Sequence, residues 1–130
     1  MNRSNIFKLI AFNLLAIFFL QSCSTNDATP SGSRAVKYEI TGDYTGSITV
    51  AAVAANGTFE AFEVKKLPWI YEITADKSVT QVGASAQGSA GKDGQKATFK
   101  VYVGGKEVSS GAGTAISGGI LILSPKFYSF

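Results

Sequence analysis

The sequence contains no histidine and only one cysteine in 130 residues. Without histidine the chain lacks the commonest general base, the commonest metal ligand and the usual pH-sensitive side chain, and it cannot form a Ser-His-Asp triad. Clustered basic residues are also missing: only Lys65 and Lys66 are adjacent, whereas nucleic-acid binding needs a basic patch. We therefore predict that this protein is not an enzyme and does not bind nucleic acid.

The N-terminus has the order of a secretory signal, which is a basic region, an apolar run and a small residue before a cleavage site. The basic residues Arg3 and Lys8 precede the apolar run 10–20, which contains one polar residue, Asn13. The apolar segment 6–20 is about 15 residues long, and a membrane span needs roughly 20. A cleaved signal is therefore expected, with an uncleaved N-terminal anchor as the alternative. Either one places the remaining chain outside the cytoplasm.

The single cysteine lies directly after this run, and Leu20-Gln21-Ser22-Cys23 resembles the lipobox of bacterial lipoproteins. The resemblance implies cleavage after Ser22 and acylation of Cys23, which would leave no thiol for a disulfide bond. Loss of the signal lowers the net charge from +3 to about +1. Ser24, rather than Asp, follows the cysteine, which favours the outer membrane by the sorting rule of enteric bacteria. We expect a protein held in the cell envelope by its N-terminal lipid.

Three parts are expected along the chain: a signal peptide at 1–22, the acylated cysteine and a flexible linker at 23–35, and one domain at 36–130. The linker is polar, contains Pro30 and Gly32, and has no periodic apolar face. The domain is long enough to build one hydrophobic core without disulfides.

From Val36 onward apolar and polar residues alternate with a period of two, which is typical of half-buried strands. Turn signals separate the segments, including Asn56-Gly57, expected as a type I′ hairpin, and Gly104-Gly105. About eight short strands and no further helix predict an all-β fold, a sandwich or a small barrel. The predicted core consists of Val36, Tyr38, Ile40, Ile48, Val50, Phe62, Trp69, Tyr71, Ile73, Phe99, Val101 and Val103.

Some local features leave alternatives open. In 58–64 the alternation changes phase, which indicates either a β-bulge near Ala61 or an edge strand that faces two environments. The glycines of 111–113 are expected to interrupt a strand. The aromatic tail 125–130 either folds back over a sheet edge, as we predict, or forms an exposed patch for a partner.

Four segments resemble the mycobacterial small membrane protein family, MmpS: residues 36–42 (VKYEITG), 46–50 (GSITV), 67–69 (LPW) and 99–108 (FKVYVGGKEV). The resemblance covers 36–115 and implies an immunoglobulin-like antiparallel β-sandwich of about seven to eight strands outside the membrane. It further implies a role as an accessory of RND-type transporters. The chain departs from the family in its lipobox, which replaces an uncleaved membrane helix, and in Gly104-Gly105, which replaces an Asp-Gly turn.

Tyr44 and Tyr102 are predicted to be exposed contact residues, because they fall on turn or outward positions. Trp69 and Tyr71 suit stacking on a sugar, but their spacing favours a place in the core. Most carboxylates fall on outward strand positions or in turns, no dense Asp/Asn loop suggests calcium, and no Ser-x-x-Lys or phosphate-loop spacing occurs. We expect no catalytic residue, no metal and no cofactor.

Together these observations predict a non-catalytic lipoprotein whose β-domain binds a partner, by resemblance an RND-type transporter complex. The alternative is a ligand-binding or adhesion module on the cell surface, for example one that binds glycans.

Overall fold

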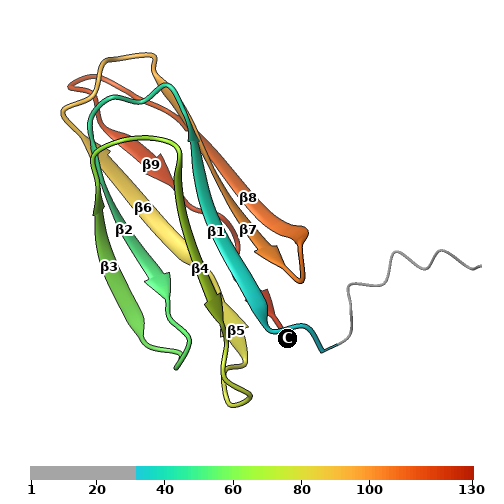
Figure 1. Ribbon diagram of the computed structural model, residues 1–130. Coiled ribbons are helices and arrows are strands. Elements are labelled where there is room, and N and C mark those ends of the chain that lie inside the picture. The colour runs from blue at the N-terminus through green and yellow to red at the C-terminus, as the bar shows by residue number, and fades with distance from the viewer. Residues whose placement is uncertain (1–31) are drawn as a thin grey trace, which may run out of the picture.

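The computed structural model describes residues 32–130, and every regular element in that range is a β-strand (Figure 1). There is no helix among these residues that is both long and apolar enough to cross a membrane. The predicted signal peptide, the acylation site Cys23 and most of the predicted linker lie outside the described residues. The ten strands are β1 (Ala35–Gly42), β2 (Ser47–Val53), β3 (Phe59–Val64), β4 (Trp69–Thr74), β5 (Gln81–Val82), β6 (Ala84–Ser89), β7 (Lys96–Val103), β8 (Lys106–Thr114), β9 (Leu121–Leu123) and β10 (Tyr128–Ser129).

Eight strands form two four-stranded sheets, and all their pairings are antiparallel. Sheet A has the order β4-β1-β7-β8, and sheet B has the order β3-β2-β6-β9. The sheets face each other in two layers, with the loops gathered at the two ends (Figure 1). The all-β prediction is confirmed, and β5 and β10, which pair only with each other, are two short strands that the sequence pattern did not separate.

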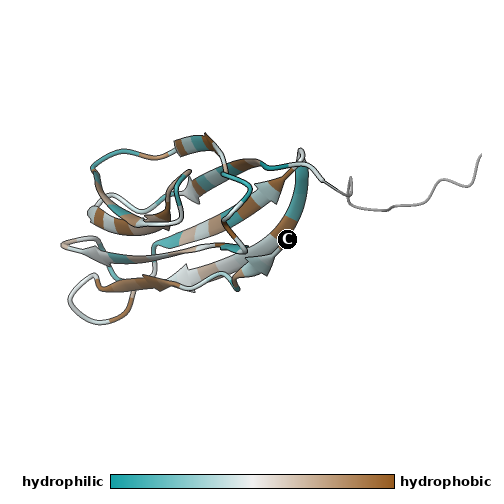
Figure 2. Ribbon diagram, turned by 90° about the horizontal axis from the view of Figure 1, so that it is seen from below, coloured by the Kyte–Doolittle hydropathy of each residue, from teal (hydrophilic) through white to brown (hydrophobic). Residues whose placement is uncertain are grey.

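The core fills the space between the sheets because alternate residues of each strand point inward. The alternation appears as bands of hydrophobic and hydrophilic residues along the strands (Figure 2). At its centre Tyr38 packs against Phe99 and Tyr71, with ring centroids 6.4 and 6.0 Å apart, and its hydroxyl donates to the Val53 carbonyl at 2.9 Å. Of the predicted core, Phe62, Trp69, Tyr71 and Ile73 are partly buried against the core, and the other eight are fully buried.

The structure decides two expectations about strand continuity: of the alternatives for 58–64 the edge strand is confirmed, and the break at 111–113 is not found. β3 pairs with β2 in unbroken register through Ala61, so the phase change reflects an edge strand with Phe62 and Val64 inward and Phe59 outward. The one register shift of sheet A lies between Val101 and Tyr102. β8 runs on through the glycines to Thr114, so the predicted interruption at 111–113 is wrong.

The hairpin turns also differ from each other. Gly104 and Gly105 both have positive φ, as a two-residue type I′ turn requires. At the first hairpin only Gly57 has positive φ, and the Asn56 side chain accepts hydrogen bonds from the Thr58 amide and hydroxyl. The predicted type I′ turn is therefore wrong: the Ala54 carbonyl accepts from Gly57, and Ala54 donates to Thr58, which is a three-residue loop.

The C-terminal tail folds back onto the domain. Tyr128 and Ser129 pair with β5, and the Phe130 amide donates to the Thr80 carbonyl. The tail thus folds back onto the edge of β5, as predicted, but Phe127 and Phe130 stay exposed, which is the feature of the alternative.

Candidate functional site

The two outer faces of the domain differ in charge. Strands β2, β6 and β9 contain no Asp, Glu, Lys or Arg, whereas β1, β4, β7 and β8 all carry charged residues. The outward residues of the three uncharged strands are Ser, Thr, Ala, Gln and Ile. Only the edge strand β3 adds charge to sheet B, through Glu60 and Glu63.

On the outer face of sheet A, charged side chains pair with one another and with Tyr102. The Lys100 Nζ and Glu107 Oε2 atoms lie 3.0 Å apart, and the hydrogen bond and the charge of Glu107 raise the Lys100 pKa. Tyr102 donates from its hydroxyl to Glu39 at 3.2 Å, and the Lys37 ammonium lies 4.2 Å from its ring centroid. The polar groups of this face are thus largely occupied with one another.

The outer face of sheet B presents neutral side chains in rows across the strands. Thr49 lies opposite Gln87, and Gln87 lies opposite Ile122. Ser85 is the cross-strand neighbour of Ala51, one row further along. Because these groups are uncharged, covering them does not require an ion to be desolvated. We call this surface the neutral face: Thr49, Ser85, Gln87, Ser89, Ile122 and Ser124.

A shallow hollow of about 500 Å³ lies on the neutral face, and its lining consists of these six residues and Ala86. Hydroxyl and amide groups supply hydrogen-bond donors and acceptors there, while Ile122 supplies an apolar side chain that is 61% exposed. The hollow can therefore accept a surface that combines hydrogen bonding with apolar contact.

Two more exposed isoleucines extend this surface toward the loop between β8 and β9. Ile120 lies two residues before Ile122 along the chain, and Ile116 forms an isolated antiparallel bridge with Ile120. Ile116 is 62% exposed and Ile120 is 40% exposed. We call Ile116, Ile120 and Ile122 the isoleucine stripe. Contiguous exposed apolar side chains of this kind are typical of protein contact surfaces.

The loops beside the stripe are held firmly. The Gln95 side chain accepts from the amides of Thr45 and Lys92 and donates to the Asp43 carbonyl. Asp93 accepts from the Gly119 amide at 3.0 Å. The stripe is therefore fixed in position, which limits the entropy lost when a partner binds.

Tyr44 belongs to this support and not to a contact surface, so the prediction that its side chain is exposed is wrong. Its exposed fraction is only 4%, and its hydroxyl donates to the Gly119 carbonyl at 2.6 Å. Its ring fills a space that Gly88 and Gly91 leave open, where an added Cβ would lie 2.7 and 2.2 Å from Tyr44 atoms. Tyr44 does lie in a turn, as the sequence predicted. Its burial could not be predicted locally, because the two glycines that pack against its ring are distant in the sequence.

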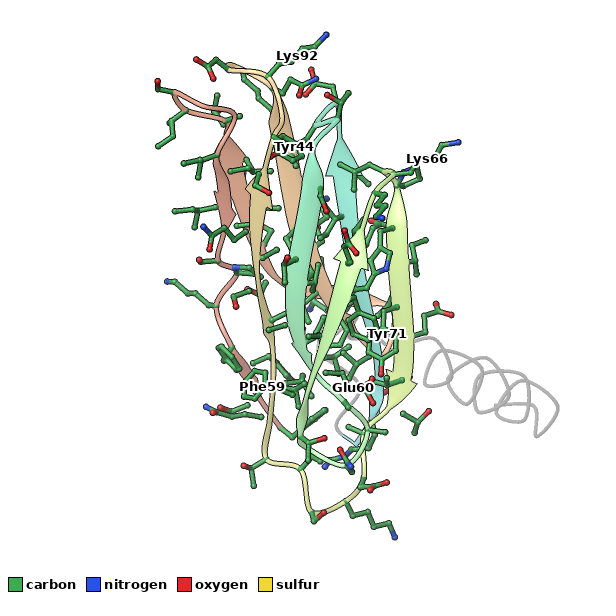
Figure 3. All side chains as sticks on the ribbon, turned by 90° about the vertical axis from the view of Figure 1, so that its left-hand side faces the viewer. Tyr44, Phe59, Glu60, Lys66, Tyr71 and Lys92 are labelled. Carbon is green, nitrogen blue, oxygen red and sulfur yellow. The ribbon has the colours of Figure 1, made fainter. Side chains whose placement is uncertain are left out.

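Tyr102 is half-buried on the outer face of sheet A, and the structure does not bring it near Tyr44, which lies in the loops at the end of the domain marked by Lys92 (Figure 3). Burial and its hydrogen bond to Glu39 raise the pKa of Tyr102. Its hydroxyl and one ring face are engaged by Glu39 and Lys37.

Trp69 and Tyr71 lie on the inward face of β4, as predicted, in an aromatic group with Phe62. The ring centroids of Phe62 and Tyr71 are 4.6 Å apart, and those of Phe62 and Trp69 are 5.4 Å apart. Tyr71 donates to Glu60 at 2.7 Å, and this hydrogen bond raises the Tyr71 pKa. This group closes the side of the sandwich between β3 and β4.

No group of three or more His, Cys, Asp or Glu side chains within residues 32–130 is arranged to hold a metal ion. The carboxylates weighed for calcium, Asp43 and Asp93, instead accept hydrogen bonds from the backbone amides of Lys96 and Gly119.

Sequence reasoning missed the neutral face and the isoleucine stripe. The signal was present as three uncharged segments, 47–53, 84–89 and 121–123. These segments are far apart in the chain, and their common surface follows only from the strand order of sheet B.

Comparisons with known proteins identify no relative of this chain. No family model, no curated protein and no solved structure matches it.

Proposed function

We propose that this protein is a non-catalytic lipoprotein of the cell envelope that binds a protein partner through the neutral face and the isoleucine stripe. The observation that carries the proposal is the continuity of uncharged strands with three exposed isoleucines on one side of the domain. Burying one such side chain yields on the order of 1.5–3 kcal/mol. The opposite face offers charges already paired with one another, and exposed ion pairs contribute little to association.

The resemblance to the MmpS family supports a partner within an RND-type transporter complex and an immunoglobulin-like class of sandwich. The antiparallel pairing and the crossing of the chain between two sheets agree with such a class. The lipobox at Cys23 supports lipid anchoring, in the outer membrane by the identity of Ser24. The anchor would hold the domain near membrane proteins and raise their effective concentration.

The anchor is tested by Cys23→Ser. We expect this variant to lose acylation and to remain as an uncleaved precursor or a soluble protein, measured by membrane fractionation and by the mass of the N-terminal peptide. If the variant is still processed and still fractionates with the outer membrane, the lipobox interpretation is wrong.

The binding face is tested by two matched substitutions on opposite sheets. Ile122 on β9 and Ile70 on β4 both point outward, and their exposed fractions are 61% and 53%. Ile122→Lys should reduce recovery of the partner from detergent-solubilised membranes by about tenfold or more, because about 1.4 kcal/mol of lost contact has that effect. Ile70→Lys should leave recovery unchanged. Equal effects of the two substitutions would rule out the neutral face as the interface.

A glycan-binding module is the second candidate, because the hollow is lined by hydroxyl and amide groups that can pair with sugar hydroxyls. In that case the purified protein would be retained on envelope polysaccharide, no protein partner would be recovered, and Gln87→Ala would weaken retention. Recovery of an RND-type transporter component would instead support the accessory role.

A further inference from the structure

Residues 115–120, between β8 and β9, contain Ile116 and Ile120, and we call them the isoleucine loop. Three exposed phenylalanines lie at the opposite end of the domain. Phe59 is 62% exposed, Phe127 is 46% exposed and Phe130 is 39% exposed. The rings of Phe59 and Phe127 have centroids 6.3 Å apart, and those of Phe130 and Tyr128 are 5.7 Å apart. We call Phe59, Phe127, Tyr128 and Phe130 the aromatic end.

The backbone holds these rings in place. β10 pairs with β5, and Phe130 donates its amide to Thr80. The Phe127 ring packs so closely on Gly83 that an added Cβ there would lie 2.6 Å from it. A hollow of about 420 Å³ lies between Phe59, Phe127 and the segment 78–81. The exposure of the rings is thus a property of the folded domain and not of a loose tail.

The predicted linker, which we call the tether, enters the domain at this same end. Arg34, two residues after the first described residue, places its guanidinium carbon 3.9 Å from the Phe130 ring centroid and donates to the carbonyls of Asp76 and Val79. Figure 1 shows the C-terminus beside the start of β1. The C-terminal Phe130 therefore lies beside the point where the preceding residues of the chain connect to the domain.

The tether is too short to hold this end far from an anchor at Cys23. Eight residues lie between Cys23 and Gly32, so nine residue-to-residue steps join the two. Fully extended they span at most about 30 Å, and as a flexible chain about 17 Å on average. An acylated Cys23 would thus keep the aromatic end close to the bilayer and the isoleucine loop, at the far end of the strands, away from it.

We propose that the aromatic end rests on the bilayer surface and inserts its phenylalanine rings at the level of the lipid headgroups. This inference rests on the proposed acylation of Cys23. Exposed phenylalanine rings are apolar side chains of the kind that interfacial proteins bury at the boundary between headgroups and acyl chains, and nearby cations attract anionic headgroups. Two exposed lysines supply such cations at this end: Lys126 directly precedes Phe127, and Lys77 directly precedes Ser78, which lines the hollow with Phe59 and Phe127.

The contact would also set the orientation of the neutral face. With the aromatic end on the bilayer, the strands of sheet B rise from the membrane, and the isoleucine stripe faces a neighbouring envelope protein. A weak surface contact is enough for this, because the lipid already supplies a high local concentration of bilayer.

The test uses the full-length protein as its own cells process it, placed in vesicles of phosphatidylethanolamine and phosphatidylglycerol, with tryptophan as a depth probe. Trp69 is the only native tryptophan and is partly buried on β4, so it serves as the internal reference. Phe59→Trp places a second probe at the aromatic end. Ile116→Trp is the matched control at the far end, because both positions are 62% exposed. Neither side chain belongs to the buried core.

On binding to vesicles, the emission that Trp at position 59 adds to that of Trp69 should shift to the blue, because the ring leaves water. Lipids that carry a quencher near the headgroup should reduce this added emission by about half or more, since interfacial side chains lie within about 5–10 Å of the boundary between headgroups and acyl chains. Ile116→Trp and the parent protein should change little. Equal quenching at positions 59 and 116, or stronger quenching at 116, would overturn the proposal.

Acylation is read separately from the mass of the N-terminal peptide, so the two proposals fail independently. An acylated protein without quenching at position 59 refutes the contact and leaves the anchor intact. An unacylated protein that is quenched at position 59 sustains the contact and refutes the anchor. An unacylated protein without quenching refutes both.

Discussion

At the residue scale, the most informative side chain is Tyr38. It is fully buried at the centre of the core, and its hydroxyl is satisfied by the Val53 carbonyl. Burial raises the pKa of Tyr38 to about 12, because the phenolate would have to leave water. The stability of the folded core therefore depends on Tyr38 keeping its proton at alkaline pH.

We predict a loss of stability between about pH 10 and pH 12. In the unfolded chain Tyr38 releases its proton near its ordinary value of 10.0, whereas in the folded domain it keeps the proton until about 12. Its contribution is fully present below pH 10 and is lost as the pH rises through the folded value. Tyr71 and Tyr102, whose pKa values are also raised, act in the same direction.

Chemical denaturation at a series of pH values measures this effect. In Tyr38→Phe the free energy of unfolding should fall less steeply between pH 10 and pH 12, because about one proton fewer is released on unfolding. The variant should also be less stable at neutral pH, because the Val53 carbonyl loses its hydrogen-bond donor. An unchanged slope would show that Tyr38 does not ionise in this range.

The fit of Tyr44 against two glycines gives a second prediction. Gly88→Ala would place a Cβ 2.7 Å from Tyr44, and the ring is fixed by its hydrogen bond to Gly119. We expect a destabilisation of about 1–3 kcal/mol from this overpacking. In a Tyr44→Ala background the same substitution should cost much less, and a double-mutant cycle of unfolding free energies measures the difference. The same cost in both backgrounds would contradict the role assigned to the ring.

At the scale of the elements, two glycines of β8 allow a neighbouring segment to pack closely against this strand. Gly111 and Gly113 face inward where β9 and the segment after it pass close by: a Cβ on Gly113 would lie 2.4 Å from the Ile122 carbonyl oxygen. Glycine normally weakens a strand, and here it permits close approach of another backbone. The sequence pattern indicated a break at these residues because the neighbouring segment was not known.

Gly113→Ala should therefore destabilise the domain by about 1–3 kcal/mol, since a backbone oxygen cannot move aside as a side chain can. The adjacent Ala112 is exposed, and Ala112→Ser should change the free energy of unfolding by less than about 0.5 kcal/mol. Thermal or denaturant unfolding of both variants measures the contrast. Equal stability of the two would mean that β9 is not held against β8 as described.

Other elements were predictable because their signals are local. The period-two pattern placed the main strands and most of the core, and Gly104-Gly105 marked its hairpin. Expectations that depended on distant neighbours were less successful: the exposure of Tyr44, the end of β8 and the shared face of β2, β6 and β9. Each depends on which strands the fold places together, and that order is set by packing of the whole core.

At the scale of the whole molecule, the domain has two ends and two faces with different surfaces. One end carries exposed aromatic rings, of which Phe130 packs on Arg34 where the tether enters, and the other carries the isoleucine loop. One face is covered with paired charges, and the other is neutral. This division agrees with a domain that is held to a membrane at one end and contacts a partner along one side.

The most direct test of the proposed function is site-specific photo-cross-linking in intact cells, with the cross-linking residue placed at position 122 or at position 70 of the full-length protein. We expect one discrete cross-linked protein from position 122 and none from position 70. No cross-link at position 122, or the same product from both positions, would contradict the neutral face as the binding surface.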